Sequence, residues 1–247
     1  MTLDEKIGQM TQVRHFDDIT DEDIATKFIG SVIHTQGPSP GEGAAGWQAR
    51  FTVLQKKALS TRLGIPLLFG VDAIHGATYI KNSTLFPQEI GLAASWDTSL
   101  AREMGEVTAY ETRASGVPWN FSPVLDQGRV PLWSRFFETL GEDVYLTKTM
   151  GSKIILGYQG LGDIDNKHVA ACLKHFVGYG FPRTGRDRTP ALIPERTMKE
   201  YHLPPFEEAI KSGALTVMVN SGEVNGVPGH ANKRLLTDVL KQDWGFV

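Results

Sequence analysis

The chain has 247 residues and a formal net charge of −3 at pH 7; 41% of its residues are hydrophobic and 21% are charged. A length near 250 residues suits one large domain, and the slightly negative charge argues against the basic surface with which proteins bind nucleic acid or anionic lipid. Apolar runs such as Ile65 to Phe69 are too short to span a membrane, and the single cysteine, Cys172, excludes internal disulfides and multi-cysteine metal sites.

The first residues predict a helix. Thr2 to Met10 carries acidic residues early and apolar residues at positions 3, 7 and 10, which share one helical face. This is not the pattern of a signal peptide. A trimmed mature chain would look the same, so the compartment stays open.

Six short segments predict β-strands. Their apolar residues run continuously rather than alternating, as in parallel strands that are covered on both faces. The predicted strands are Gln9 to Val13, Gly30 to His34, Pro66 to Asp72, Trp119 to Leu125, Val169 to Phe176 and Leu215 to Asn220.

Amphipathic helices are predicted between these strands, with residues at their ends that favour capping. The predicted helices run from Asp97 or Ser99 to Gly116, from Glu142 to Gly157 or Gly160, from Pro194 through Phe206, and from a cap at Thr237 to Gly245. The segment from Gly37 to Gly43 predicts a loop.

Alternating strands and helices predict a parallel sheet, either open and doubly wound or closed into a barrel. Two features favour the barrel. The first strand is not followed by a phosphate-binding glycine loop, and almost every strand ends in polar or ionisable residues, as at the functional face of a barrel. We expect residues 1–247 to form one partial TIM-type (β/α)8 barrel with about six strands.

Polar residues at the strand ends are the candidates for a site. Asp72 follows an apolar strand, and a carboxylate there needs donors or solvent; the alternative is a turn cap. Lys174 and His175 are adjacent and should face different sides of their strand. Both donate hydrogen bonds, which suits a hydroxyl-rich ligand, whereas the alternative is a surface lysine beside a packed histidine.

Two further segments leave alternatives open. Arg129 and Arg135 flank Trp133, so one arginine could contact hydroxyls while the other pairs with a carboxylate; the alternative is a solvated charged face. Asn220 and Glu223 end the last strand and are either substrate contacts or part of a turn.

Known cofactor and metal signatures do not occur in the sequence. It contains neither a Gly-x-Ser-x-Gly elbow, nor a His-Glu-x-x-His helix, nor a Walker loop, and its histidines share no metal-ligand spacing. We expect neither an essential metal nor an organic cofactor.

A series of motifs in register resembles the N-terminal barrel domain of glycoside hydrolase family 3, the β-glucosidase and β-xylosidase group. The motifs are Leu3 to Met10, Gly70 to Gly76, Phe86 to Gln88, Asn120 to Asp126, Glu138 to Asp143, Lys174 to Phe176, and Met218 to Ser221 with Asn225-Gly226.

The resemblance implies a retaining, exo-acting β-glycosidase that hydrolyses terminal non-reducing β-D-glucosyl residues by double displacement. Its ligand would be a β-linked oligosaccharide or glycoside, and its location periplasmic or secreted. Asp72 would accept hydrogen bonds from the sugar hydroxyls, and Arg129, Lys174 and His175 would donate them.

The chain departs from the family pattern. The usual Arg-Asp-Pro-Arg-Trp-Gly-Arg run reads Arg129-Val-Pro-Leu-Trp-Ser-Arg135, which keeps the two end arginines. The Asp-Ser-His run of the N-acetylglucosaminidase branch does not occur. In the family, the nucleophile is an Asp in a Ser-Asp-Trp run and the acid/base Glu comes from a following α/β sandwich domain. We expect both beyond Val247, so the chain would be a fragment that is inactive alone.

Two other functions remain open at this stage: a non-catalytic sugar-binding protein on the same barrel, and an unrelated barrel aldolase with Lys174 as its Schiff-base lysine. Six strands also leave two unpaired sheet edges, which predicts marginal stability or an oligomer formed through those edges.

Overall fold

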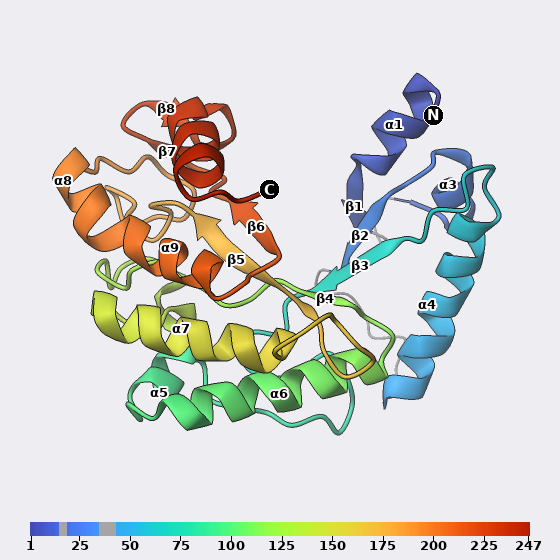
Figure 1. Ribbon diagram of the computed structural model, residues 1–247, viewed down its shortest axis with the longest axis horizontal. Coiled ribbons are helices and arrows are strands. Elements are labelled where there is room, and N and C mark those ends of the chain that lie inside the picture. The colour runs from blue at the N-terminus through green and yellow to red at the C-terminus, as the bar shows by residue number, and fades with distance from the viewer. Residues whose placement is uncertain (15–18, 35–42) are drawn as a thin grey trace.

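Six parallel strands, arranged in chain order, form one curled sheet (Figure 1). The structure is a computed structural model that describes residues 1–14, 19–34 and 43–247. The strands are β1 (Gln12–Arg14), β2 (Ser31–His34), β3 (Leu68–Val71), β4 (Trp119–Asn120), β5 (Ala170–Phe176) and β6 (Thr216–Val219). Each strand pairs in parallel with the next one along the chain, which confirms the predicted partial barrel.

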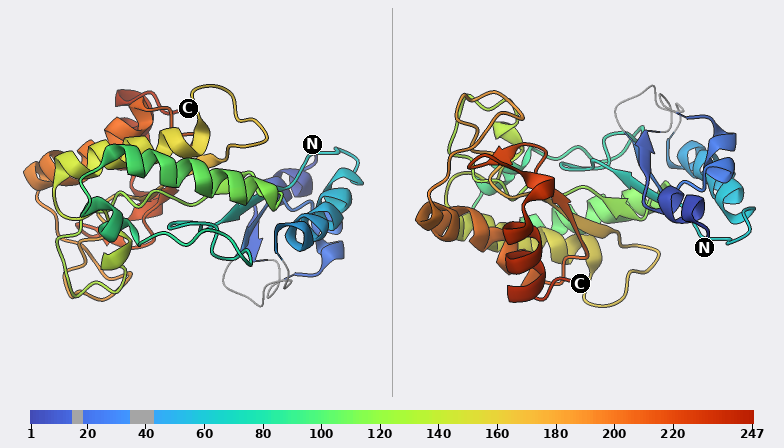
Figure 2. Two further views of the ribbon diagram at one scale, coloured as in Figure 1. Left: turned by 90° about the horizontal axis from the view of Figure 1, so that it is seen from below. Right: turned by 90° about the horizontal axis from the view of Figure 1, so that it is seen from above.

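Helices flank the strands along the chain, and most of them lie along the outer side of the sheet (Figures 1 and 2). They are α1 (Leu3–Gln9), α3 (Asp21–Thr26), α4 (Gly43–Leu59), α5 (Glu89–Ala93), α6 (Thr98–Ala114), α7 (Val144–Gln159), α8 (Glu195–Thr197), η2 (Met198–His202), α9 (Leu203–Lys211) and η4 (Arg234–Asp243). Short elements complete the chain: η1 (Phe136–Glu138), the antiparallel pair β7 (Glu223–Val224) and β8 (Val227–Pro228), and η3 (Gly229–Ala231).

Helix caps explain where the helices begin. Asp97 accepts hydrogen bonds from the first backbone N–H groups of α6, and Asp143 does the same for α7. The prediction for η4 was wrong: Thr237 lies inside this helix. The cap comes instead from Asn232, whose Oδ1 accepts from the Leu235 N–H at 3.1 Å.

All six strands are shorter than the sequence predicts, and for β1 and β4 the sequence shows why. A capping box between Thr2 and Glu5 starts α1, which continues through Gln9, so β1 begins only at Gln12. Strand β4 ends at Asn120, and an isolated bridge joins Val124 to Lys174 farther along; Pro123 between them has no N–H to donate. Of the predicted loop from Gly37 to Gly43, residues 37–42 lie outside the described residues and Gly43 begins α4.

The core consists of two apolar clusters. One packs β2 and β3 against α4, whose buried residues Trp47, Phe51, Leu54 and Ala58 recur at helical spacing. The larger cluster joins β5 to α6, α7 and α9. Helices α6 and α7 approach closely where Gly105 meets Gly157: a Cβ on Gly157 would lie 2.8 Å from the Gly105 Cα.

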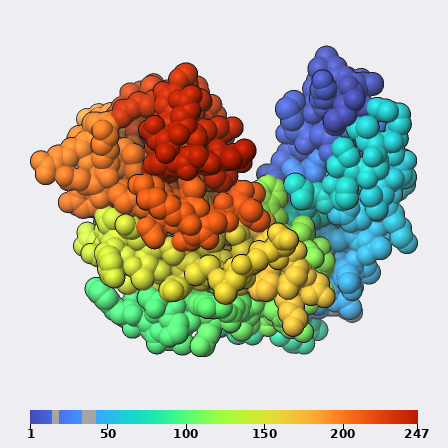
Figure 3. All heavy atoms as spheres, viewed as in Figure 1, coloured from blue at the N-terminus to red at the C-terminus, as the bar shows by residue number. Residues whose placement is uncertain are grey.

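The two ends of the sheet do not meet. Strands β1 and β6 are its edges, and neither has an outer strand neighbour within the described ranges. Figure 3 shows the surface hollowed between α1 and the C-terminal segment. The carboxyl ends of β3 to β6 lie at one edge of this curled sheet, and the polar side chains gather there.

Candidate functional site

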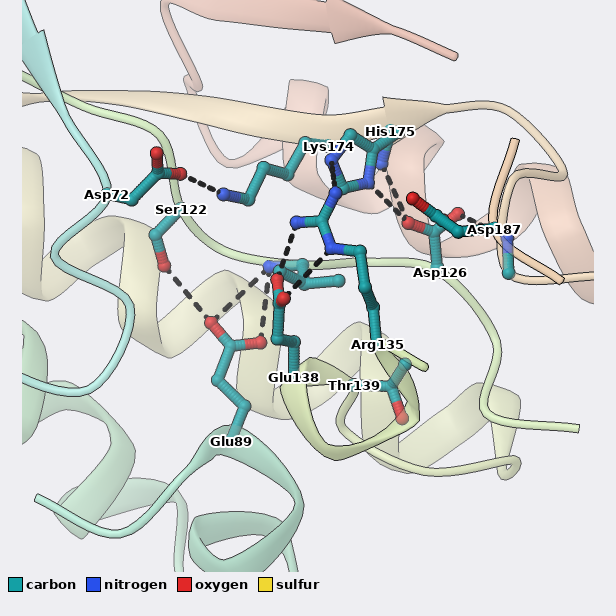
Figure 4. A network of polar contacts seen from close by, with 12 residues as sticks. Asp72, Glu89, Ser122, Asp126, Arg135, Glu138, Thr139, Lys174, His175 and Asp187 are labelled. Carbon is teal, nitrogen blue, oxygen red and sulfur yellow. Dashed lines mark hydrogen bonds and ion pairs between the residues drawn. The ribbon is translucent and has the colours of Figure 1, made fainter. Parts of the chain in front are cut away.

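Polar side chains converge where β3, β4 and β5 end (Figure 4). Lys174 and His175 are the last polar residues of β5, and Figure 4 shows Lys174 extending toward Asp72 and His175 toward Asp126. The predicted divergence of the two neighbouring side chains is therefore present. The Lys174–His175 peptide bond is cis.

Asp72 and Lys174 form an ion pair. Lys174 Nζ donates to Asp72 Oδ1 at 2.5 Å. The lysine side chain is 1% exposed, whereas that of Asp72 is 43% exposed. A buried ammonium group needs a partner, and Asp72 provides it while keeping part of its carboxylate open to solvent.

His175 is held in one tautomer. Its Nδ1 lies 2.8 Å from Asp126 Oδ2, and its Nε2 lies 3.0 Å from Arg135 Nη1. Because a guanidinium can only donate, Nε2 must accept, and Nδ1 carries the proton that Asp126 accepts. Burial lowers the pKa of His175, the charges of Arg135 and Lys174 add to this, and Asp126 opposes it. The imidazole is therefore neutral near pH 7.

Asp126 and Glu138 fix the partners of His175. Asp126 also accepts from the backbone N–H groups of His175 and Gly180, at 3.0 and 3.1 Å. Glu138 binds Arg135 through two bonds, from Nε at 2.9 Å and from Nη2 at 2.6 Å. A two-point bond of this kind sets the direction of a guanidinium as well as its position.

The buried carboxyl group of Glu89 holds a backbone segment that contacts Lys174. Glu89 accepts from the Ser122 hydroxyl at 3.0 Å and from the Val124 N–H at 3.1 Å. Burial raises the pKa of Glu89 well above its ordinary value. This contact holds the segment whose Leu125 N–H donates to the Lys174 carbonyl at 2.7 Å.

The other predicted residues have different partners. The guanidinium of Arg129 lies over the ring of Tyr201, 4.3 Å from its centroid. Asn220 is buried, and its side chain donates to the Val177 carbonyl at 3.0 Å and accepts from the Gly222 N–H at 2.6 Å. Glu223 belongs to the hairpin strand β7. Their substrate contacts stay predictions.

Comparison with known proteins identifies the chain. The glycosyl hydrolase family 3 N-terminal domain matches residues 2–247. The chain belongs to this family. It is 40% identical over its whole length to the lysosomal beta glucosidase of Dictyostelium discoideum and 34% identical to the periplasmic beta-glucosidase of Salmonella typhimurium, of which it covers 33% and 31%. It thus spans about a third of the length of these curated relatives.

Solved structures agree with this assignment. The exo-1,3/1,4-beta-glucanase of a Pseudoalteromonas species matches the whole chain with a TM-score of 0.93 at 33% identity, and the chain covers 32% of it. A variant beta-glucosidase of Listeria innocua in complex with laminaribiose matches with a TM-score of 0.85 at 33% identity, and 35% of it is covered. Within the described residues, none of the helices is long and apolar enough to cross a membrane.

Within the family's arginine motif, the structure distinguishes the two end arginines. Arg135 contacts His175, whereas Arg129 lies on Tyr201. Sequence reasoning left open which arginine pairs with a carboxylate and selected Arg129 as the sugar contact; it missed Asp126 and Glu138 as members of the cluster. Asp126 could have been found, because it ends the motif Asn120 to Asp126 directly after the fourth predicted strand.

Proposed function

We propose that this chain holds the terminal β-D-glucosyl unit in a retaining, exo-acting β-glycosidase of the β-glucosidase type. The observation that supports this most is the arrangement of neighbouring charged side chains: the half-exposed acceptor Asp72 lies beside the donor Lys174, and the donor Arg135 is held next to them by His175 and Glu138. Acceptors and donors at fixed spacing suit a ring of sugar hydroxyls.

The same side chains would favour the hydrolysis of the glycoside as well as its binding. Hydrogen bonds to the sugar hydroxyls strengthen when the ring flattens toward an oxocarbenium-like transition state. The ion pair between Lys174 and Asp72 and the two-point bond between Arg135 and Glu138 keep these groups oriented before substrate arrives, so little reorganisation is needed.

We infer that these side chains bind the sugar and do not cut the bond. Retaining hydrolysis requires two carboxylates about 5 Å apart, one as nucleophile and one as acid/base. Of the carboxyl groups in this cluster, Glu89, Asp126 and Glu138 are buried, which leaves Asp72 as the one that is open to solvent. Residues 1–247 alone should therefore bind glucose without releasing nitrophenol from aryl β-glucosides.

Calorimetry with glucose on the chain, and hydrolysis of aryl β-glucosides by the protein as its gene encodes it, test the proposal together. Glucose binding that is lost in Lys174→Met, with turnover by the gene product, supports it. Glucose binding without turnover by the gene product favours the sugar-binding alternative. Turnover by residues 1–247 alone would overturn the inference about the carboxylates.

The compartment is a separate proposal. A periplasmic or secreted location is supported by the name of the Salmonella relative, which is a periplasmic enzyme. Fractionation of cells that express the gene, followed by immunodetection, tests it.

A further inference from the structure

A second layer of side chains stands behind His175 and Arg135. The ring of Tyr179 makes an edge contact with the His175 ring at a centroid distance of 4.6 Å. The guanidinium of Arg135 lies 5.7 Å from the centroid of the same ring. Tyr179 is buried, so its position limits where both of these groups can lie.

Trp133 and Asp187 fix Tyr179 in turn. The Trp133 ring meets Tyr179 edge-on at 5.3 Å, and its Nε1–H donates to Asp187 Oδ1 at 2.8 Å. Trp133 is 1% exposed, so Asp187 supplies its N–H with an acceptor where little solvent reaches the ring.

Asp187 lies on a loop with its own internal bonds. The Thr189 hydroxyl donates to the Arg186 carbonyl at 2.7 Å, and the Arg183 N–H donates to the Pro190 carbonyl at 2.9 Å. At the start of the loop, a Cβ on Gly180 would lie 3.1 Å from the Trp133 ring. The loop is therefore braced, and it can transmit the position of the carboxylate to the tryptophan.

The carboxylate is suited to accept a hydrogen bond and not to transfer a proton. Burial raises the pKa of Asp187, but the Trp133 hydrogen bond and the charges of Arg135 and Arg188 outweigh burial and leave the pKa below its ordinary value. Asp187 is thus ionised at neutral pH.

We propose that Asp187 is a positioning residue, which acts through Trp133 and Tyr179 to hold His175 and Arg135 at the sugar. The proposal rests on the proposed function, because it assigns the second layer of that same site. The contacts named above connect two loops that are far apart in sequence, since 54 residues separate Trp133 from Asp187.

The kinetic test compares Asp187→Ala with Asp187→Asn in the protein as its gene encodes it. Asn keeps an acceptor oxygen, so it should retain kcat/KM for an aryl β-glucoside within about threefold, whereas Ala should lose about tenfold because the sugar-holding groups shift. Trp133→Phe removes the donor and should match Ala. The double variant Asp187→Ala/Trp133→Phe should have a kcat/KM no lower than either single variant, because each substitution breaks the same hydrogen bond. Asp163→Ala, at an exposed aspartate, is the matched control and should change nothing.

The second readout is the imidazole of His175, followed by NMR titration of the chain. In Asp187→Ala, a looser Tyr179 and Arg135 would reduce burial and positive charge around His175, so its pKa should rise, whereas Asp187→Asn should restore it. Asp126, Arg135 and Lys174 are the charged groups that act on this ring.

The two proposals fail in different ways. A His175 pKa that is unchanged in both Asp187→Ala and Trp133→Phe would overturn the positioning role. It would do so even if the parent protein hydrolyses the glycoside fully. Absence of glycoside turnover by the gene product would count against the proposed function and leave the titration result standing. If Asp187→Ala does not fold, Trp133→Phe tests the same bond.

Discussion

The ammonium group of Lys174 lies 2.5 Å from Oδ1 of Asp72, 102 positions earlier in the chain. The two side chains differ in exposure, at 1% for Lys174 and 43% for Asp72. The ion pair is therefore buried on the Lys174 side and open to solvent on the Asp72 side. A sugar hydroxyl that approaches Asp72 from the solvent side would displace water without breaking the ion pair.

This asymmetry predicts unequal effects from breaking the same pair. Asp72→Ala strands a buried ammonium and should lower the free energy of unfolding by about 2–3 kcal/mol, somewhat under the usual range for buried pairs because Asp72 is partly solvated. Lys174→Met leaves only a solvated carboxylate and should cost less than about 1 kcal/mol. Both should abolish measurable glucose binding. Urea unfolding and calorimetry check this, with Arg102→Ala, which breaks an exposed pair, as the neutral control. Equal destabilisation by the two changes would contradict the argument.

Sequence patterns predicted the fold better than the site, for a physical reason. Strand and helix positions depend on local periodicity and caps, such as Asp97 and Asp143, which neighbouring residues reveal. Asp126 and Arg135 act through His175, which is 49 and 40 positions away. Single-sequence reasoning cannot show which of two arginines reaches that ring. Asp72 could be predicted because it follows an apolar strand directly, and Lys174 and His175 because they end the apolar run of β5.

His202 predicts a loss of stability in acid. Burial lowers its pKa to about 4, from an ordinary value of 6.5. The unfolded chain binds the proton first as pH falls, so stability is complete above about pH 6.5 and declines toward pH 4. The loss from pH 7 to pH 5 should be about 2 kcal/mol. Urea unfolding at these two pH values should show that the free energy of unfolding of His202→Phe falls by about 2 kcal/mol less than that of the parent. An equal fall in both proteins would show that His202 does not cause the loss.

Glu89 predicts the opposite slope. Burial raises its pKa, so the unfolded chain releases its proton first as pH rises above about 4.5, and stability declines until the folded pKa is reached. Glu89→Gln removes this ionisation and should gain stability relative to the parent as pH rises. Glu89→Leu should instead lose about 2–4 kcal/mol, because the Ser122 hydroxyl and the Val124 N–H lose their acceptor. Denaturant unfolding from pH 5 to pH 8 distinguishes the two variants. If the free energy of unfolding of Glu89→Gln depends on pH as that of the parent does, this explanation is refuted.

The close contact between α6 and α7 requires a glycine at position 157. A Cβ there would lie 2.3 Å from the Arg102 carbonyl oxygen, so Gly157→Ala should push the helices apart and cost about 1–3 kcal/mol. Gly162→Ala is the matched control, since a Cβ on Gly162 would meet nothing within 4 Å. Thermal unfolding followed by circular dichroism compares the two. Equal melting temperatures would mean that the helices move apart at little cost.

The open sheet edges predict self-association of residues 1–247. Strands β1 and β6 are the two edges of the sheet within the described part of the chain, and edge strands pair readily with another strand. The sedimentation coefficient should therefore rise with protein concentration. Met218→Lys places a charge on β6 and should suppress the rise, whereas Leu161→Lys adds the same charge at a residue that is 83% exposed and away from the sheet, and should not. Equal suppression by both lysines would point to net charge rather than the edge, and a concentration-independent monomer would refute the prediction.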